Sequence, residues 1–278
     1  MTKLLHISDT HFGTEQPPVI EALVALAAAR RPDVLVFSGD VTQRARPAQF
    51  DAARRFCDRL RIPHLLALPG NHDVPLYNLA ARLWRPFGGY QRVFGLHLEP
   101  VLDLPGVLVI GVNTTRASRH KDGEVSAAQV DRVCRRLRGA RADQLRVVVT
   151  HQPAAVVRPH DVPDRLHGGP RALAAWRDAG ADLVLGGHIH LPYVVESSAA
   201  LDAVHAADPG CPLWCVQAGT AVSSRVRHGT CNSVNLIEWD AHASPRACRV
   251  QRFDFAPDAG FSPKADDALR LRSIAPRM

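Results

Sequence analysis

Short apolar runs recur along this chain, and each ends in a cluster of small or polar residues. Residues 4–8 lead into Asp9, and residues 34–38 lead into Gly39 and Asp40. Apolar runs of this length bounded by glycine or polar residues are typical of buried strands, and the segments between them carry helical periodicity. The alternation predicts an α/β protein whose sheets are covered by helices, with polar residues gathered at the edge where the strands end.

The same pattern continues to about residue 255. Further strands are predicted at 65–68, 107–112, 145–149 and 183–185. Helices are predicted at 19–29 and from Pro47 to Leu60, and a third begins with a capping box at Ser126–Gln129 and runs to Leu137. Three last apolar runs, 213–217, 234–239 and 249–255, lack intervening helices and predict an antiparallel ending. We therefore expect one catalytic domain over 1–255 and a loosely attached tail over 256–278, which is polar and lacks a strand pattern.

The net charge favours anionic partners without naming one. The chain carries a formal net charge of +7 over 278 residues, which suits a phosphate-bearing substrate. The densest basic group lies between Arg132 and Arg141 on a predicted helix and has no interleaved aromatic residues. A solvated helix face is therefore favoured there over a nucleic-acid surface, and a nucleic-acid partner is not expected.

Targeting signals are absent from the sequence pattern. No apolar stretch reaches the roughly 18 to 20 residues that a membrane-spanning helix requires. The N-terminus enters a strand-like segment without the apolar core of a signal peptide, which predicts a cytoplasmic protein. The six cysteines match neither a zinc ribbon nor a redox motif in their spacing, and they are interpreted as reduced packing residues.

Five short segments at the predicted strand ends carry metal-ligating residue types. They are Asp9-x-His11, Gly39-Asp40, Gly70-Asn71-His72-Asp73, His151 and Gly187-His188-x-His190. Carboxylate, imidazole and amide groups suit divalent ions such as Mn²⁺, Fe²⁺ or Zn²⁺, and the lack of cysteine argues against a thiolate site. Side chains two residues apart in an extended segment point the same way, so Asp9 and His11 can share an ion. Each segment alone is more often an ordinary turn, but all five together favour a metal centre.

In order and spacing, these segments resemble the motifs of the calcineurin-like metallophosphoesterase superfamily across most of residues 4–190. The resemblance implies a two-layer β-sandwich flanked by helices and a pair of divalent metal ions. It implies that one ion is held by Asp9, His11, Asp40 and His190, and the other by Asp40, Asn71, His151 and His188. It also implies that His72 contacts the substrate phosphate or protonates the leaving oxygen, and that Asp73 orients His72.

Within the superfamily, residues 6–11, 39–42 and Asp122-Gly123 followed by Gln129 are most similar to the class III cyclic-nucleotide phosphodiesterases. Many members of that branch carry a second histidine where this chain has Gln152. The resemblance implies hydrolysis of a small phosphodiester, either a 3′,5′-cyclic nucleotide or another small diester. Two adjacent divalent ions lower the pKa of a bridging water, so a metal-bridging hydroxide is the expected nucleophile for in-line attack.

Other functions stay open from the residues alone. A phosphomonoesterase, a nucleotide pyrophosphatase or a nuclease would use the same metal site. A phosphoesterase fold that has lost catalysis and become a metal-poor protein-binding scaffold would have metal ligands replaced by other residues. Every ligand that the resemblance implies is present here.

Several residues outside the five segments are candidate substrate contacts. Asn113 and Arg116 follow the predicted strand at 107–112, and Arg44 follows Asp40. The loop after His151 contains His160, Asp161 and His167, which are further candidates. The segment 74–99 is the densest aromatic region and could be a cap over the site, a homodimer contact or a packed excursion.

Overall fold

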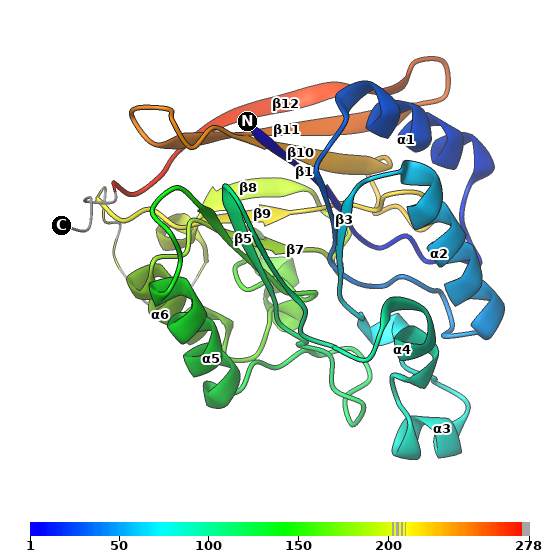
Figure 1. Cartoon of the computed structure of the whole chain (residues 1–278). Helices are drawn as coiled ribbons and strands as arrows, with labels where there is room; N and C mark the ends of the chain where they lie inside the picture. The colour runs from blue at the N-terminus through cyan, green and yellow to red at the C-terminus, as the bar shows by residue number, and fades with distance from the viewer. Residues whose placement is uncertain (202, 204–205, 207, 209, 274–278) are drawn as a thin grey trace.

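The computed structural model describes residues 1–201, 203, 206, 208 and 210–273, which contain two six-stranded sheets (Figure 1). The first sheet has the order β12 (Gly260–Arg270), β11 (Ala247–Ala256), β10 (Ser233–Trp239), β1 (Thr2–Ile7), β2 (Val34–Phe37) and β3 (His64–Ala67). The second has the order β4 (Val101–Leu104), β5 (Val107–Gly111), β6 (Leu145–Val149), β7 (Leu183–Gly186), β9 (Trp214–Gln217) and β8 (Tyr193–Glu196).

Helices cover the outer faces of both sheets. Those on the first sheet are α1 (Pro17–Arg30), α2 (Pro47–Leu60) and α4 (Gly88–Phe94), and those on the second are α5 (Ala127–Arg138) and α6 (Gly169–Ala179). The short helix α3 (Leu79–Trp84) lies beyond α4 in Figure 1. None of the helices in the described ranges is long and apolar enough to cross a membrane. The predicted two-layer β-sandwich flanked by helices is confirmed.

The central strands of each sheet are buried on both faces because alternate residues enter different cores. Leu4 and Val36 join the core between the two sheets, whereas Leu5 and Phe37 face the helices of the first sheet. The second sheet divides its residues in the same way. This arrangement explains why the strands read as continuous apolar runs rather than as alternating patterns.

Parallel pairing brings the polar strand ends to one edge of the sandwich. Strands β1, β2 and β3 are parallel in the first sheet, and β5, β6, β7 and β9 are parallel in the second. The five predicted segments follow β1, β2, β3, β6 and β7. The sequence order of strands and polar residues therefore correctly predicted that these five segments lie at one edge.

The expected loose tail over 256–278 is wrong for most of its length. Residues Gly260–Arg270 form β12, which pairs antiparallel with β11 along its whole length. Its strand pattern was hidden because it is an edge strand whose sequence includes Pro263, Asp266 and Asp267, residue types that edge strands tolerate. Residues 274–278 lie outside the described residues.

The predicted antiparallel ending is right for β10 and β11 but wrong for β9. Strand β9 pairs parallel with β7 and antiparallel with the unpredicted β8. Helix α6 was also not predicted, although Pro170 stands in its first turn and Gly180 ends it. Ala172, Leu173 and Trp176 give α6 its buried face. Helix α5 begins with the predicted capping box, in which the Ser126 side chain accepts from the backbone of Gln129.

We predict that Leu269→Ala lowers the free energy of unfolding by about 2 to 4 kcal/mol, because this β12 side chain is buried against the core between the sheets. Urea unfolding followed by circular dichroism measures the change. Lys264→Ala on the exposed side of the same strand is the matched control and should change stability by no more than about 0.5 kcal/mol. Equal, small effects of both substitutions would show that β12 is not an integral part of the fold.

Candidate metal centre

Hydrogen bonds fasten the loops that follow the strands to one another across the two sheets. The backbone N–H of Asp9 donates to Gly39 O at 3.0 Å within the first sheet. The ring Nδ1 of His151 from the second sheet donates to Ser38 O at 2.9 Å. The backbone N–H of His188, also from the second sheet, donates to Asp9 Oδ2 at 2.9 Å. The centre therefore lies on the junction of the sheets and draws residues from both.

Left-handed backbone conformations turn the side chains into the centre. Asp9, His11 and Asp40 have φ angles of 53°, 40° and 48°, and His188 and His190 have 72° and 57°. Residues with a Cβ rarely adopt this region, and when they do so in a cluster the site is usually functional. The expectation of an extended Asp9-x-His11 segment is wrong, because two left-handed residues rather than a pleated strand aim both side chains at the same point.

Two glycines allow the sheets to approach closely enough for this arrangement. A Cβ on Gly39 would overlap the His151 ring, and one on Gly187 would overlap Ser8 Oγ and come within 2.5 Å of Asp9 Oδ2. Gly39 also has a φ of 113°, which residues with a Cβ rarely adopt. Glycine at these two positions is therefore required by the space that the neighbouring side chains occupy.

The first group of potential ligands consists of Asp9, His11 and His190. Asp9 Oδ1 lies 3.3 Å from His190 Nε2 and 3.8 Å from His11 Nε2, and the two Nε2 atoms are 3.2 Å apart. The ligand atoms of the three residues all lie within 4.8 Å of one another. This spacing suits a single cation bound between them.

The second group contains Asp40, His151 and His188, with Asn71 beside them. His151 Nε2 lies 3.3 Å from Asp40 Oδ1 and 3.3 Å from Asn71 Oδ1. The other oxygen of Asp40, Oδ2, lies 3.6 Å from His11 Nε2 in the first group. The two oxygens of the Asp40 carboxylate therefore face the two groups. The structure brings all seven predicted metal ligands together.

Unsatisfied buried atoms show that the site fits divalent cations. Asp9 Oδ1, His11 Nδ1 and both ring nitrogens of His188 are buried without a hydrogen-bond partner. Burying such groups unpaired is costly, and cation coordination satisfies carboxylate oxygens and neutral imidazole nitrogens. All of these atoms belong to residues of the two groups described above.

The electrostatics of the cluster favour ionised carboxylates, neutral imidazoles at His11 and His188, and a proton on His151. Burial lowers the pKa of His11 to about 3 and that of His188 to about 4. Burial acts on His151 in the same direction, but the Asp40 carboxylate outweighs it and raises the pKa of His151 to about 9. For Asp40, burial opposes ionisation, yet His151 holds the pKa well below its usual range. A protonated His151 thus balances the negative charge of Asp40, and a metal cation can fill the same role.

His72 lies at the edge of the centre and is oriented by a backbone carbonyl. Its Nδ1 donates to Gln43 O at 3.0 Å, its backbone N–H donates to Asp40 Oδ1 at 2.9 Å, and its ring packs edge-on against His11 with centroids 4.7 Å apart. The Nε2 atom is therefore the ring nitrogen that can reach a substrate.

Asp73 does not hold His72 directly, in contrast to the role implied by the family resemblance. Its buried carboxylate accepts hydrogen bonds from Val41 N, Gly70 N, Thr42 N and Thr42 Oγ1 at 2.8 to 3.0 Å. These bonds fix the Gly70–Asp73 turn against the loop after β2. Asp73 thus positions the whole turn that carries Asn71 and His72.

The sequence pattern missed the residues that hold His190. Its Nδ1 donates to Arg225 O, and Thr220 Oγ1 lies 2.9 Å from the same nitrogen. Thr220 follows Gly219 shortly after β9, so the strand-end rule that found the other residues would have identified it. Such partners fix ring orientation in metal sites.

The three candidate substrate contacts have different outcomes. Arg44 lines a small hollow together with Asn71 and His72. Arg116 instead donates to Asn113 O at 2.8 Å and to Gln129 Oε1 at 2.6 Å, while Asn113 Oδ1 accepts from Thr115 N. Asn113 and Arg116 therefore fasten their loop to the start of α5, and among the described residues neither forms a hydrogen bond with the histidines of the centre.

A second hollow, of about 450 Å³, opens on His188 and His190. His160 and Asp161 line it, and the buried Asp161 carboxylate forms a salt bridge with Arg227 at 2.8 Å. His167 instead pairs with Asp122 at 3.9 Å and is not among the lining residues. Two of the three candidates from the loop after His151 therefore lie beside the centre.

Comparison with known proteins identifies the chain. Residues 2–192 match the family model of the calcineurin-like phosphoesterases, which is more than half of the 278 residues. The chain belongs to the calcineurin-like phosphoesterase family. It is consequently a metal-dependent phosphoester hydrolase, from a family that typically binds divalent metals.

Two curated relatives of this phosphoesterase bear the name probable cyclic nucleotide phosphodiesterase. One, from Synechococcus, is 28% identical over 66% of this chain and 67% of its own length. The other, from Rhodococcus erythropolis, is 24% identical over 67% of this chain and 64% of its own length. The phosphoesterase thus spans about two thirds of the length of these relatives.

Solved structures of low sequence identity share the fold. A dimetal phosphatase from Danio rerio superimposes with a TM-score of 0.60 at 12% identity over 97% of this phosphoesterase and 98% of its own chain. A purple acid phosphatase from yellow lupin gives a TM-score of 0.66 at 12% identity over 98% of this chain and 54% of its own. Identities this low carry information about the fold alone.

We predict that Gly187→Ala lowers the divalent-metal content of the purified phosphoesterase, because the added methyl group displaces the Asp9 carboxylate and Ser8. Metal analysis after dialysis against Mn²⁺ measures the loss, and thermal unfolding without metal separates misfolding from weak binding. Gly139→Ala, whose Cβ would make ordinary contacts at 3.5 Å, is the control and should leave the metal content unchanged. Full metal occupancy in the Gly187 variant would contradict the described packing.

Proposed function

We propose that this phosphoesterase is a dinuclear phosphodiesterase that hydrolyses a small phosphodiester, either a 3′,5′-cyclic nucleotide or another small diester. The observation that carries the proposal is the position of Asp40. Its Oδ2 faces His11 at 3.6 Å and its Oδ1 faces His151 at 3.3 Å, so one carboxylate serves two groups of ligands. A carboxylate shared in this way supports two cations side by side.

The proposed ligand sets divide the seven residues around that carboxylate. Asp9, His11, Asp40 and His190 would hold one ion, and Asp40, Asn71, His151 and His188 the other. When bound, the two ions would supply activation of water and neutralisation of charge on the phosphoryl oxygens. Nitrogen and oxygen ligands of this kind suit Mn, Fe or Zn, and geometry and availability would select among them.

His72 is the proposed general acid for the leaving oxygen. Because Gln43 O holds the proton on Nδ1, Nε2 carries a proton only when the ring is an imidazolium. In that form His72 can donate to the departing alkoxide and then stay hydrogen-bonded to Gln43. Asp73 acts as a positioning residue through the turn that carries His72, and Arg44 lies where its guanidinium can contact the leaving group.

The names of the relatives support a diester over a monoester. Besides the two relatives above, a glycerophosphodiester phosphodiesterase from Enterobacter lignolyticus is 39% identical over 25% of this chain and 29% of its own length. Diester hydrolysis is thus the chemistry that these names have in common. A phosphomonoesterase, a nucleotide pyrophosphatase and a nuclease are the alternatives that the substrate comparison below separates.

We predict that His72→Ala lowers turnover of alkyl phosphodiesters about 10²- to 10⁴-fold while metal content stays near that of the native protein. The loss should be much smaller for an aryl diester with a nitrophenolate leaving group, which needs little protonation. Steady-state kinetics and metal analysis on the same preparations measure both effects.

His64→Ala serves as the matched control, because this histidine begins β3 and is exposed, and it should leave both readouts unchanged. Since the ligand atoms of His72, His11 and Asp40 lie within 4.8 Å of one another, metal loss in the His72 variant would instead make His72 a ligand.

We predict that the protein reconstituted with Mn²⁺ hydrolyses a 3′,5′-cyclic nucleotide and an aryl phosphodiester faster than an aryl phosphomonoester or single-stranded DNA. Release of nucleotide, phenolate or phosphate measures each rate, and a chelator should abolish all of them. Turnover of the monoester or the DNA alone would retain the metal centre but refute the phosphodiesterase assignment.

A further inference from the structure

The segment between Val74 and Leu98 presents a concentration of large apolar side chains to solvent. Tyr77, Leu79, Leu83, Trp84 and Leu96 are each between 73% and 78% exposed, and we call these five residues the apolar patch. In the described part of the chain, only Met1 and Val226 are otherwise exposed large hydrophobic residues. Single exposed leucines are ordinary, but five such residues in one short segment indicate a binding surface.

The apolar patch is separate from the hydrophobic core that lies beside it. The neighbouring helix α4 is anchored, since Tyr90 is buried, donates to Ala67 O at 2.7 Å and stacks on Phe94 with centroids 5.1 Å apart. Helix α3, in contrast, has no buried residue, and Figure 1 shows it at the outer end of the molecule beyond α4. The aromatic segment is thus part packed excursion and part exposed surface.

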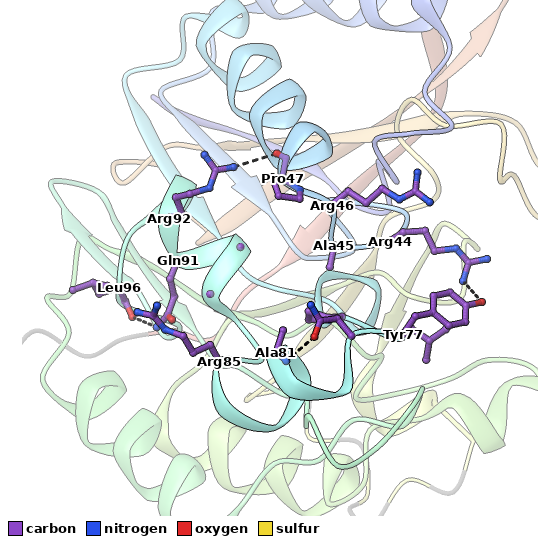
Figure 2. A pocket seen from close by; sticks show the side chains of 15 residues that line it. Arg44, Ala45, Arg46, Pro47, Tyr77, Ala81, Arg85, Gln91, Arg92 and Leu96 are labelled. Atoms are coloured by element: carbon purple, nitrogen blue, oxygen red, sulfur yellow. Dashed lines mark hydrogen bonds between the residues drawn. The ribbon is translucent and has the colours of Figure 1, made fainter.

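Positive charge lies beside Tyr77 and Leu96 of the apolar patch. Residues 74–98 contain no aspartate or glutamate. Arg44, Arg46, Arg85 and Arg92 line a hollow of about 1040 Å³ between the start of α2 and helices α3 and α4, and Tyr77 and Leu96 line the same hollow (Figure 2). Arg92 pairs with Asp51, but no carboxylate within the described residues forms a salt bridge with Arg46 or Arg85. The partner surface must therefore be both apolar and anionic.

We propose that this face docks onto the surface of an anionic lipid bilayer. Leucine and tryptophan side chains insert at the boundary between headgroups and acyl chains, where the amphipathic rings of tryptophan and tyrosine are favoured. Arginine side chains around them bind the phosphate groups and respond to the negative surface potential of anionic lipids. The apolar patch and the guanidinium groups that line the adjoining hollow supply these two contributions.

Charge disfavours a second copy of this chain as the partner. In a two-fold symmetric interface the same patch meets itself, so the arginines of both copies would be brought together with no carboxylate in the segment to separate them. Nucleic acid would satisfy the arginines but would leave exposed leucines without an apolar partner. Of these three partners, the lipid surface satisfies both kinds of side chain.

Docking would place the metal centre close to the headgroups. Arg44 and Leu76 line both the large hollow and the small hollow that contains Asn71 and His72. The route from the patch to the proposed general acid is therefore a short one along the same surface. The docking proposal itself rests on the surface and does not depend on the proposed substrate.

Vesicle binding by the full chain tests the proposal. We expect the protein to sediment with vesicles of phosphatidylglycerol and phosphatidylcholine at physiological salt and to stay in solution with phosphatidylcholine alone. Leu83→Ser combined with Trp84→Ser should weaken binding at least about tenfold, because the apolar contribution to interfacial binding is lost. Arg46→Gln combined with Arg85→Gln should weaken it as well.

A matched charge control is Arg135→Gln combined with Arg136→Gln, which removes the same charge from exposed positions of α5 and should bind like the native protein. Brominated lipids should quench Trp84 fluorescence, since Trp176 and Trp239 are buried and the half-buried Trp214 lies on β9 of the second sheet. Trp84→Phe should lose this quenching. Turnover of a water-soluble diester verifies that every variant is folded. Vesicle binding that survives the Leu83 and Trp84 changes would overturn the proposal, and so would the absence of quenching. It would also be overturned if these changes abolished dimer formation or DNA binding instead of vesicle binding.

Discussion

Two buried carboxylates at the junction of the sheets are the constraint on which the rest of the structure depends. Asp9 and Asp40 have 0% and 2% exposed side chains, and both stay ionised because histidines surround them. Isolated carboxylates in such a position would be expensive, since little water remains to solvate them. The left-handed residues, the glycines and the histidine rings are all arranged to place positive charge or hydrogen-bond donors against these two groups.

The strands of both sheets determine where the loops that carry these residues lie. Parallel pairing delivers five loops to one edge, and the glycines at 39 and 187 let loops of the two sheets make contact there. Backbone carbonyls of Ser38, Gln43 and Arg225 then fix the orientations of His151, His72 and His190. The precision of the centre therefore comes from main-chain atoms, whose positions the sheets determine.

Much of this could be predicted from the sequence, because polar residues at the ends of apolar runs are a local signal. The α/β class and the five polar segments could be predicted in that way, whereas the sandwich fold and the set of seven potential ligands were implied by the family resemblance. Strand β12 could not, since an edge strand with one exposed face needs no apolar pattern. The contact between Gln43 O and His72 could not be predicted either, because any residue type supplies a carbonyl. The backbone of Asp9 and His11 was wrongly expected to be extended, because the left-handed conformation is imposed by tertiary contacts rather than by local preference.

The origin of the ligands in both sheets has a consequence for how the protein is assembled. His11 and His190 are separated by 179 positions in sequence, yet their Nε2 atoms lie 3.2 Å apart. Contacts between such distant residues form only after the entropy of closing a long loop has been overcome. The complete ligand set thus exists only once the two sheets have docked on each other. Partly synthesised chains that end before β7 is complete still lack His188 and His190.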